Sequence, residues 1–152
     1  MKSQVARFVS AWSKCYTAIK TRLSITKSVV LIMQKEEFIR LVERAVEALP
    51  EEFLDRLENV IIDVADEPTA EQLDSSDEED GVELLGLYEG VPLTERGNSP
   101  FMMPDRITIF QKAIEASFHT REEIVTEIQN VVRHEIAHYF GIDDDRLEEL
   151  GL

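Results

Sequence analysis

The chain has 152 residues, a length typical of one domain, and 43% of them are apolar. Its single cysteine, Cys15, excludes an intramolecular disulfide and gives no sign of an oxidising compartment. No uninterrupted apolar run approaches the roughly 20 residues of a membrane-spanning helix. We therefore expect a cytoplasmic protein without a membrane span.

The net charge of −15 is unevenly distributed along the chain. Residues 1–32 contain six Lys or Arg and no acidic residue, whereas residues 33–152 hold the other 10 basic residues and all 31 acidic ones. A body this acidic repels the phosphate backbone of nucleic acids, so we expect no nucleic-acid partner. High charge alone also serves solubility, so it identifies no particular partner.

Residues 1–32 form a basic N-terminal extension rich in Ser and Thr, as in organelle targeting segments and in tails without fixed structure. The apolar stretch 29–33 is shorter than the roughly 7 to 15 residues of a secretory signal, so secretion is not expected. Met33 opens the acidic body, and translation that starts there would omit the extension. Targeting, disorder and absence from the translated protein stay open, and we predict that the domain spans residues 33–152.

Two helices and a strand are expected at the start of this domain. Apolar residues recur at three- and four-residue spacing over 34–49, and Pro50 ends the run. A short helix is predicted to begin at Pro50, with Glu51 and Glu52 in its first turn. The alternation of β-branched and other residues over 60–65 predicts a strand.

The middle of the chain contains an acidic segment and two more predicted strands. Residues 69–81 are highly charged and lack periodicity, so we expect a mobile loop. Their spacing does not match a calcium-binding loop. Residues 84–88 and 107–110 are predicted strands, separated by a loop that contains Gly and Pro.

The last long element is a predicted helix. Thr120 and Glu123 occupy the two side-chain positions of a capping box, and apolar residues continue at helical spacing up to Gly141. The order of elements indicates an α+β domain, in which a small, mainly antiparallel sheet packs against long helices.

His134 and His138 lie four residues apart on this helix, so their side chains project about 40° apart and can bind one ion. Glu135, about 100° around the helix from His134, is placed to hold a water molecule at that ion. This HExxH pattern is typical of hydrolytic zinc sites. We predict Zn²⁺ as cofactor, with both histidines as ligands and Glu135 as the catalytic general base. Two hydrogen-bonded histidines at the margin of a core are the structural alternative.

A third ligand is expected close by, because 14 residues of the sequence follow His138. Gly141 permits a sharp turn, after which Asp144 fits the spacing best. The alternatives are the neighbouring acidic residues Asp143, Asp145, Glu148 and Glu149. His119 precedes the helix cap and is expected to be a solvated loop residue.

On these residues the chain resembles the minimal zincin-like metallopeptidases, small bacterial proteins with a compact metzincin-type motif. The similar segments are HEIAHYFGIDD at 134–144, EEFIRLVERAVEALPEEF at 36–53, LLGLYEGVPLTERG at 84–97 and PDRITIFQKAI at 104–114. The resemblance implies a compact zincin-like domain in which His134, His138 and Asp144 bind zinc and Glu135 is the general base. The methionine that follows the third ligand in larger metzincins is absent.

Two functions are consistent with these observations. The first is zinc-dependent hydrolysis of a peptide or protein substrate; the second is a zinc-stabilised, non-catalytic binding or regulatory protein. The intact Glu135 favours the enzyme, because a structural zinc site is closed by four ligands and needs no base. Tyr139, Tyr88 and Arg106 are candidates for a second hydrogen-bond donor, and 84–88 for pairing with substrate backbone. Substrate specificity and oligomeric state stay open.

Overall fold

The computed structural model describes residues 32–75, 83–97 and 103–149. Contacts divide the chain into two compact units, of which the larger is Ser28–Gly141 and the other includes the C-terminal segment from Ile142. The predicted extension, 1–32, lies almost wholly outside the described residues and stays a prediction. None of the helices in the described ranges combines the length and apolarity that crossing a membrane requires.

The larger unit contains helices and the strands of a small mixed sheet, which confirms the predicted α+β class. In chain order they are α2 (Lys35–Glu47), α3 (Glu51–Leu54), β1 (Val60–Ala65), α4 (Ala70–Ser75), β2 (Gly86–Glu89), β3 (Asp105–Phe110), α5 (Gln111–Ser117) and α6 (Arg121–Tyr139). Pro50 precedes α3 with φ −57°, as its fixed ring favours. The other unit contains α7 (Asp144–Glu149).

The described strands form one sheet in the order β1-β3-β2. β1 runs parallel to β3, with Val60 opposite Asp105 and Ala65 opposite Phe110. β2 runs antiparallel to β3, with Gly86 opposite Ile109. The sheet is therefore mixed rather than mainly antiparallel. Residues 66–104 provide the long connection that a parallel pair requires.

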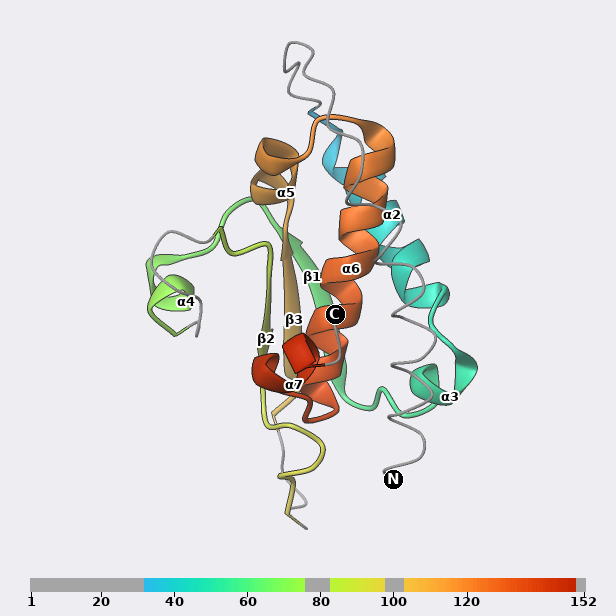
Figure 1. The fold of residues 1–152 in the computed structure, drawn as a ribbon, viewed down its shortest axis with the longest axis vertical. Helices are drawn as coiled ribbons and strands as arrows, with labels where there is room; N and C mark the ends of the chain where they lie inside the picture. The colour runs from blue at the N-terminus through green and yellow to red at the C-terminus, as the bar shows by residue number, and fades with distance from the viewer. Residues whose placement is uncertain (1–31, 76–82, 98–102, 150–152) are drawn as a thin grey trace. The chain divides into compact units, whose positions relative to one another are not determined.

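The main core lies between the sheet and the helices α2 and α6, which run side by side over it (Figure 1). Ile107 and Ile109 of the central strand are fully buried there. α6 contributes an apolar stripe at helical spacing, and its fully or almost fully buried members are Ile124, Ile128, Val132 and Ile136. This stripe fixes the rotation of α6 about its axis, and with it the direction of every other side chain on that helix.

Three of the described helices, α4, α5 and α7, were not predicted. α4 occupies 70–75, where a loop was expected; Thr69 and Gln72 exchange side-chain hydrogen bonds of 3.1 and 3.2 Å at its start, which the acidic composition concealed. The rest of that predicted loop lies almost wholly outside the described residues. α5 begins at the residue after β3, and no turn residue between them marks where the strand ends and the helix begins. The predicted strand 84–88 is 86–89, and the strand predicted at 107–110 begins at Asp105.

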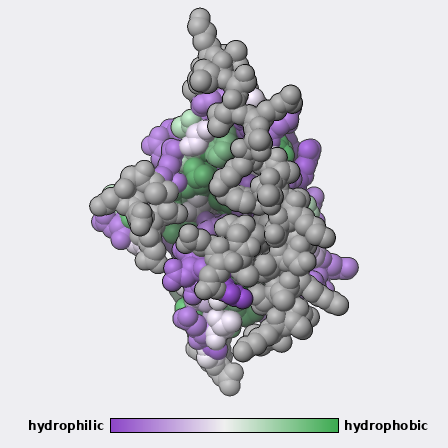
Figure 2. Space-filling view, viewed as in Figure 1, coloured by the Kyte–Doolittle hydropathy of each residue, from purple (hydrophilic) through white to green (hydrophobic). Residues whose placement is uncertain are grey.

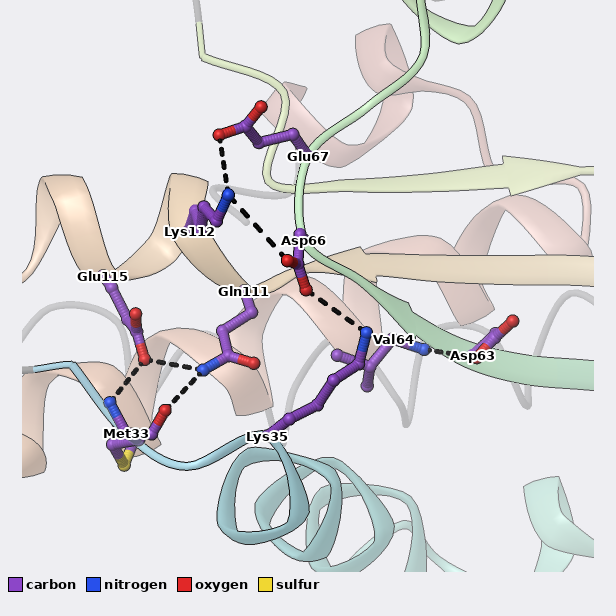
Figure 3. A network of polar contacts seen from close by, with 9 residues as sticks. All are labelled: Met33, Lys35, Asp63, Val64, Asp66, Glu67, Gln111, Lys112 and Glu115. Carbon is purple, nitrogen blue, oxygen red and sulfur yellow. Dashed lines mark hydrogen bonds and ion pairs between the residues drawn. The ribbon is translucent and has the colours of Figure 1, made fainter.

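The start of the described chain is tied to α5 by buried polar groups (Figure 3). The Met33 backbone N–H donates to Glu115 Oε1 at 2.8 Å, and Gln111 Nε2 donates to the Met33 carbonyl at 2.9 Å. Gln111 Nε2 also donates to Glu115 Oε1 at 2.9 Å. Glu115 is 3% exposed, so this network replaces solvent for all three residues.

Hydrophilic residues occupy much of the described surface that is visible in Figure 2, with a smaller hydrophobic area in its upper half. The large apolar residues that are exposed in the described part of the chain are few and scattered: Ile32, Ile61, Leu73, Val91 and Met103. Isolated apolar residues of this kind are normal on a protein surface and define no binding patch.

Candidate metal centre and general base

The helix that holds both histidines is fixed at its first turn by the predicted capping box. Thr120 Oγ1 accepts the Glu123 backbone N–H at 3.2 Å, and Glu123 Oε2 accepts the Thr120 N–H at 3.0 Å. These bonds satisfy backbone donors that have no partner within a helix. The backbone N–H of Thr120, followed by that of His119, lowers the pKa of Glu123, so the capping carboxylate is held in its ionised form.

The imidazoles of His134 and His138 lie next to each other at the other end of α6. Their ring centroids are 4.6 Å apart, and the ring planes cross at 83°. Both side chains are half-buried, because they lie on the flank of the apolar stripe rather than within it. The two rings therefore lie on the same side of the helix, as their four-residue spacing requires.

Glu135 lies on the face of α6 that packs against the sheet, and it is 6% exposed. It follows Ile128 and Val131 around the helix, and its side chain rests over Gly86 of β2. A carboxylate at this depth is shielded from most of the solvent, and it neighbours the two imidazoles in the sequence.

The end of α6 is a sharp turn at Gly141, whose φ is +79°. The Gly141 N–H donates to the His138 carbonyl at 2.9 Å. A side chain at this position would meet both an unfavourable backbone conformation and the Thr94 side chain. The Leu93 N–H donates to the Tyr139 carbonyl at 2.8 Å, so the loop after β2 holds this end of the helix in place.

In the C-terminal segment, the two candidate aspartates occupy different positions at the start of α7. Asp143 Oδ1 accepts the Arg146 backbone N–H at 2.9 Å, and the Asp143 carbonyl accepts the Leu147 N–H at 2.9 Å, so Asp143 caps the helix. Asp144 is the first helical residue and is exposed. Its carboxylate, like the imidazoles of His134 and His138, is a group that can bind a metal ion.

The residues proposed as second hydrogen-bond donors have other partners. The Tyr139 hydroxyl donates to the Arg56 carbonyl at 2.9 Å and accepts the Glu58 N–H at 3.2 Å. Arg106 pairs with Asp63 at 3.4 Å. Because side chains alternate along β3, Arg106 lies on the face opposite Ile107 and therefore away from α6. His119 is an exposed loop residue, as predicted, and Met103 is 86% exposed.

Tyr88 belongs to a polar cluster at the end of β2. Its hydroxyl donates to Asp105 Oδ2 at 3.1 Å, and Arg96 forms an ion pair with the same oxygen. Burial raises the pKa of Tyr88 to about 12, and the bond to Asp105 acts in the same direction against the opposing effect of Arg96. The phenol therefore stays protonated, and Arg96 also lies 4.7 Å over the Tyr139 ring.

The profile of the zincin-like metallopeptidases matches residues 57–152. The chain belongs to this family of zincin-like metallopeptidases, which confirms the resemblance seen in its sequence. No curated protein matches the chain. Among solved structures, a conserved hypothetical protein from Thermo thermophilus is similar, with 24% identity over 78% of this chain and 97% of that chain and a TM-score of 0.48.

The residues present fit the zinc ion that the family implies. Imidazole nitrogen and carboxylate oxygen are both ordinary zinc ligands, and three protein groups leave a fourth position open, as in catalytic rather than structural sites. By their chemistry, His134, His138 and Asp144 would supply this set of donors. Gly86 was not singled out from the sequence, because only its position beneath Glu135 distinguishes it from other glycines.

Proposed function

We propose that the chain is a zinc-dependent peptidase in which His134, His138 and Asp144 bind the metal and Glu135 is the general base. The observation that supports this most directly is the position of Glu135. Glu135 follows His134 and precedes His138 in the sequence, and the rings of these two histidines are adjacent in space. Its buried carboxylate rests against β2, a strand at the edge of the sheet. A structural zinc site is closed by four protein ligands and therefore needs no general base beside it.

Asp144 is our choice of third ligand over Asp143 for a physical reason. The Asp143 carboxylate already accepts a backbone N–H at the start of α7, and leaving it would uncap the helix. Asp144 is the first residue of the helix, and its side chain is exposed and within reach of solvent ions.

Hydrolysis of a peptide bond requires a nucleophile, a proton acceptor and a protonated leaving group. Bound zinc supplies a Lewis acid that polarises the substrate carbonyl and lowers the pKa of water to roughly 7. Glu135 accepts a proton as the water oxygen adds to the carbonyl carbon. It then returns this proton to the amine nitrogen as the carbon–nitrogen bond breaks, which gives a carboxylic acid and an amine. Transfer of the second proton of the water from the acid to the amine leaves a carboxylate and an ammonium group.

The edge of β2 is suited to bind the substrate backbone. The Phe110 N–H donates to the Leu85 carbonyl at 2.9 Å, so the next pair, Gly86 and Ile109, is of the type in which N–H and C=O point away from the partner strand. An extended peptide can pair with Gly86 along this edge, next to Glu135. This refines the predicted pairing segment, 84–88, to the strand 86–89.

The test is Glu135→Gln in the full chain, because an amide of nearly the same shape cannot accept the proton. We expect zinc content and thermal unfolding to stay as in the parent, and kcat to fall by about 10²- to 10⁴-fold on a peptide identified from a diverse library. His134→Ala and His138→Ala are the matched controls, and these variants should lose most of the bound zinc.

Two outcomes would overturn the proposal. Equal cleavage by the parent and the Glu135→Gln variant would mean that another residue, or a contaminant, performs the chemistry. If the zinc-loaded parent cleaves no peptide in the library, the zinc-stabilised binding protein becomes the better description of the chain.

A further inference from the structure

Gly86 lies where a side chain cannot be accommodated. A β-carbon on Gly86 would lie 2.5 Å from Val131 Cγ1, 2.9 Å from Glu135 Oε1 and 3.1 Å from Glu135 Cγ. The first two separations are shorter than real β-carbon contacts. Two side chains from successive turns of α6 therefore occupy the space that a residue at position 86 would otherwise fill.

The direction of this contact follows from the sheet. Gly86 stands directly opposite Ile109, and residues that are directly opposite in an antiparallel pair project from the same face. Ile109 is fully buried beneath α6, so position 86 also faces that helix. The absence of a side chain at Gly86 thus leaves a space on the helix-facing side of the strand, and the Glu135 carboxylate occupies part of it.

We propose that Gly86 is a positioning residue for Glu135, because the absent side chain sets where the carboxylate of the general base lies. The inference rests on the proposed function, because it presupposes that Glu135 is the general base. A side chain at position 86 displaces the carboxylate by contact, while His134 and His138 on the flank of α6 keep their places. The displacement lowers the rate of the chemical step without releasing zinc.

Gly86→Ala alone is an ambiguous test, because the new methyl group also meets Val131. Val131→Ala removes the Cγ1 atom that makes the shorter of these contacts. The informative comparison is therefore Val131→Ala with the double variant Val131→Ala, Gly86→Ala, both in the full zinc-loaded chain. Gly97→Ala is the matched control, because a β-carbon at Gly97 would meet nothing within 4 Å.

In this comparison we expect one zinc per chain in both variants and a loss of kcat on the order of 100-fold in the double variant, as for a misplaced catalytic group. KM should change by less than about threefold, because the base acts after binding. In a chain that already carries Glu135→Gln, adding Gly86→Ala should lower kcat little further. The effects of two substitutions do not add when one residue acts through the other. Gly97→Ala should match the parent.

A second measurement needs no catalysis. Gly86→Ala should lower the thermal midpoint of the Val131→Ala chain, and this loss should shrink when Glu135 is also replaced by Ala, because the contacted carboxylate is gone. An equal loss with and without Glu135 would overturn the positioning role, even if the parent is an active peptidase. If the parent is inactive but the two losses differ, the packing of Gly86 and Glu135 stands and the proposed function alone fails.

Discussion

Asp143 and Asp144 differ by one position in the sequence, and the backbone separates their chemical roles. Asp143 lies just before α7, where a carboxylate bonds to a backbone N–H two or three residues ahead. Asp144 is the first residue of the helix, and its side chain is exposed. The sequence alone left these two residues as alternatives, because the spacing of acids does not reveal where a short helix begins.

The two aspartates should therefore respond differently to substitution. We expect Asp144→Ala to weaken zinc binding by more than about 100-fold, beyond the cost of losing a group that only orients a ligand. Asp143→Ala should keep the zinc affinity within about threefold of the parent. It should lower the free energy of unfolding by about 1 kcal/mol, because the helix cap is lost. Competition with a chelator at fixed pH measures both affinities. A larger zinc loss from Asp143→Ala would reverse the assignment.

Substitution of Tyr139, which is adjacent to the HExxH motif, tests whether its hydroxyl takes part in catalysis or only stabilises the fold. Tyr139→Phe leaves the Glu58 N–H and the Arg56 carbonyl without the hydroxyl that now satisfies both, so we expect a loss of about 1 to 3 kcal/mol in the free energy of unfolding. Zinc content and kcat/KM should stay unchanged. Urea unfolding and peptide cleavage measure the two effects, and a fall in kcat at unchanged stability would instead indicate contact with substrate.

Residues that act within one helical turn could be predicted, whereas residues that act across the fold could not. The relation of His134 to His138 depends only on helical geometry, so four residues of spacing were sufficient to place them together. The relation of Gly86 to Glu135 depends on how β2 lies beneath α6. Nothing in the local pattern around Gly86 contains that information.

At the scale of the element, prediction succeeded where a boundary has its own chemistry. Pro50 and Thr120 each mark the start of a helix through a backbone preference or a side-chain cap, and the structure places α3 and α6 there. α5 has no side-chain cap hydrogen bond at Phe110, and it continues an apolar strand. Its start is therefore decided by tertiary packing rather than by local sequence.

The capping box should contribute measurably to the helix that holds the proposed ligands. Thr120→Ala should lower the free energy of unfolding by about 1 kcal/mol at pH 7, because the Glu123 N–H loses its acceptor. Thr126→Ala is the control: its hydroxyl only donates to the Glu122 carbonyl within the helix, so a change within about 0.5 kcal/mol is expected. Urea unfolding at constant zinc saturation compares the two, and equal losses would contradict the capping role.

The cap also has a pH dependence of known sign. The folded-state pKa of Glu123 lies below the ordinary value of 4.5, so the stabilisation is present above that value and is lost as the pH falls through the lowered pKa. Glu123→Gln should remove this part of the acid dependence. The exposed position of Glu123 makes the effect small, since solvent screens it.

At the scale of the whole molecule, the fold class could be predicted but the strand pairing could not. Helical and alternating periods identified most elements, and their order indicated an α+β domain, as observed. The parallel pairing of β1 with β3 joins segments on either side of α4 and β2. A strand pattern records which residues are buried and not which strand lies beside it, so the partner had to come from the structure.

The contacts of Met33 bear on where the folded body begins. Its backbone is held by Glu115 and Gln111, and its side chain is 6% exposed, with Arg121 Nη1 3.8 Å from its sulfur. Lys35, two residues later, pairs with Asp66 at 3.2 Å and so joins the start of α2 to the end of β1 (Figure 3). Met33 therefore packs as part of the larger unit, and the start of the domain at this residue stays a prediction.

A chain shortened to begin at Met33 should fold as the full chain does. We expect its free energy of unfolding to lie within about 1 kcal/mol of the parent, because every contact of Met33 named above is kept. Its zinc content should also be unchanged. Gln111→Ala, made in both the full and the shortened chain, is the control: it leaves the Met33 carbonyl without its donor and should cost about 1 to 3 kcal/mol in each. Urea unfolding measures all four proteins, and a large loss on shortening alone would show that residues before Met33 pack on the domain.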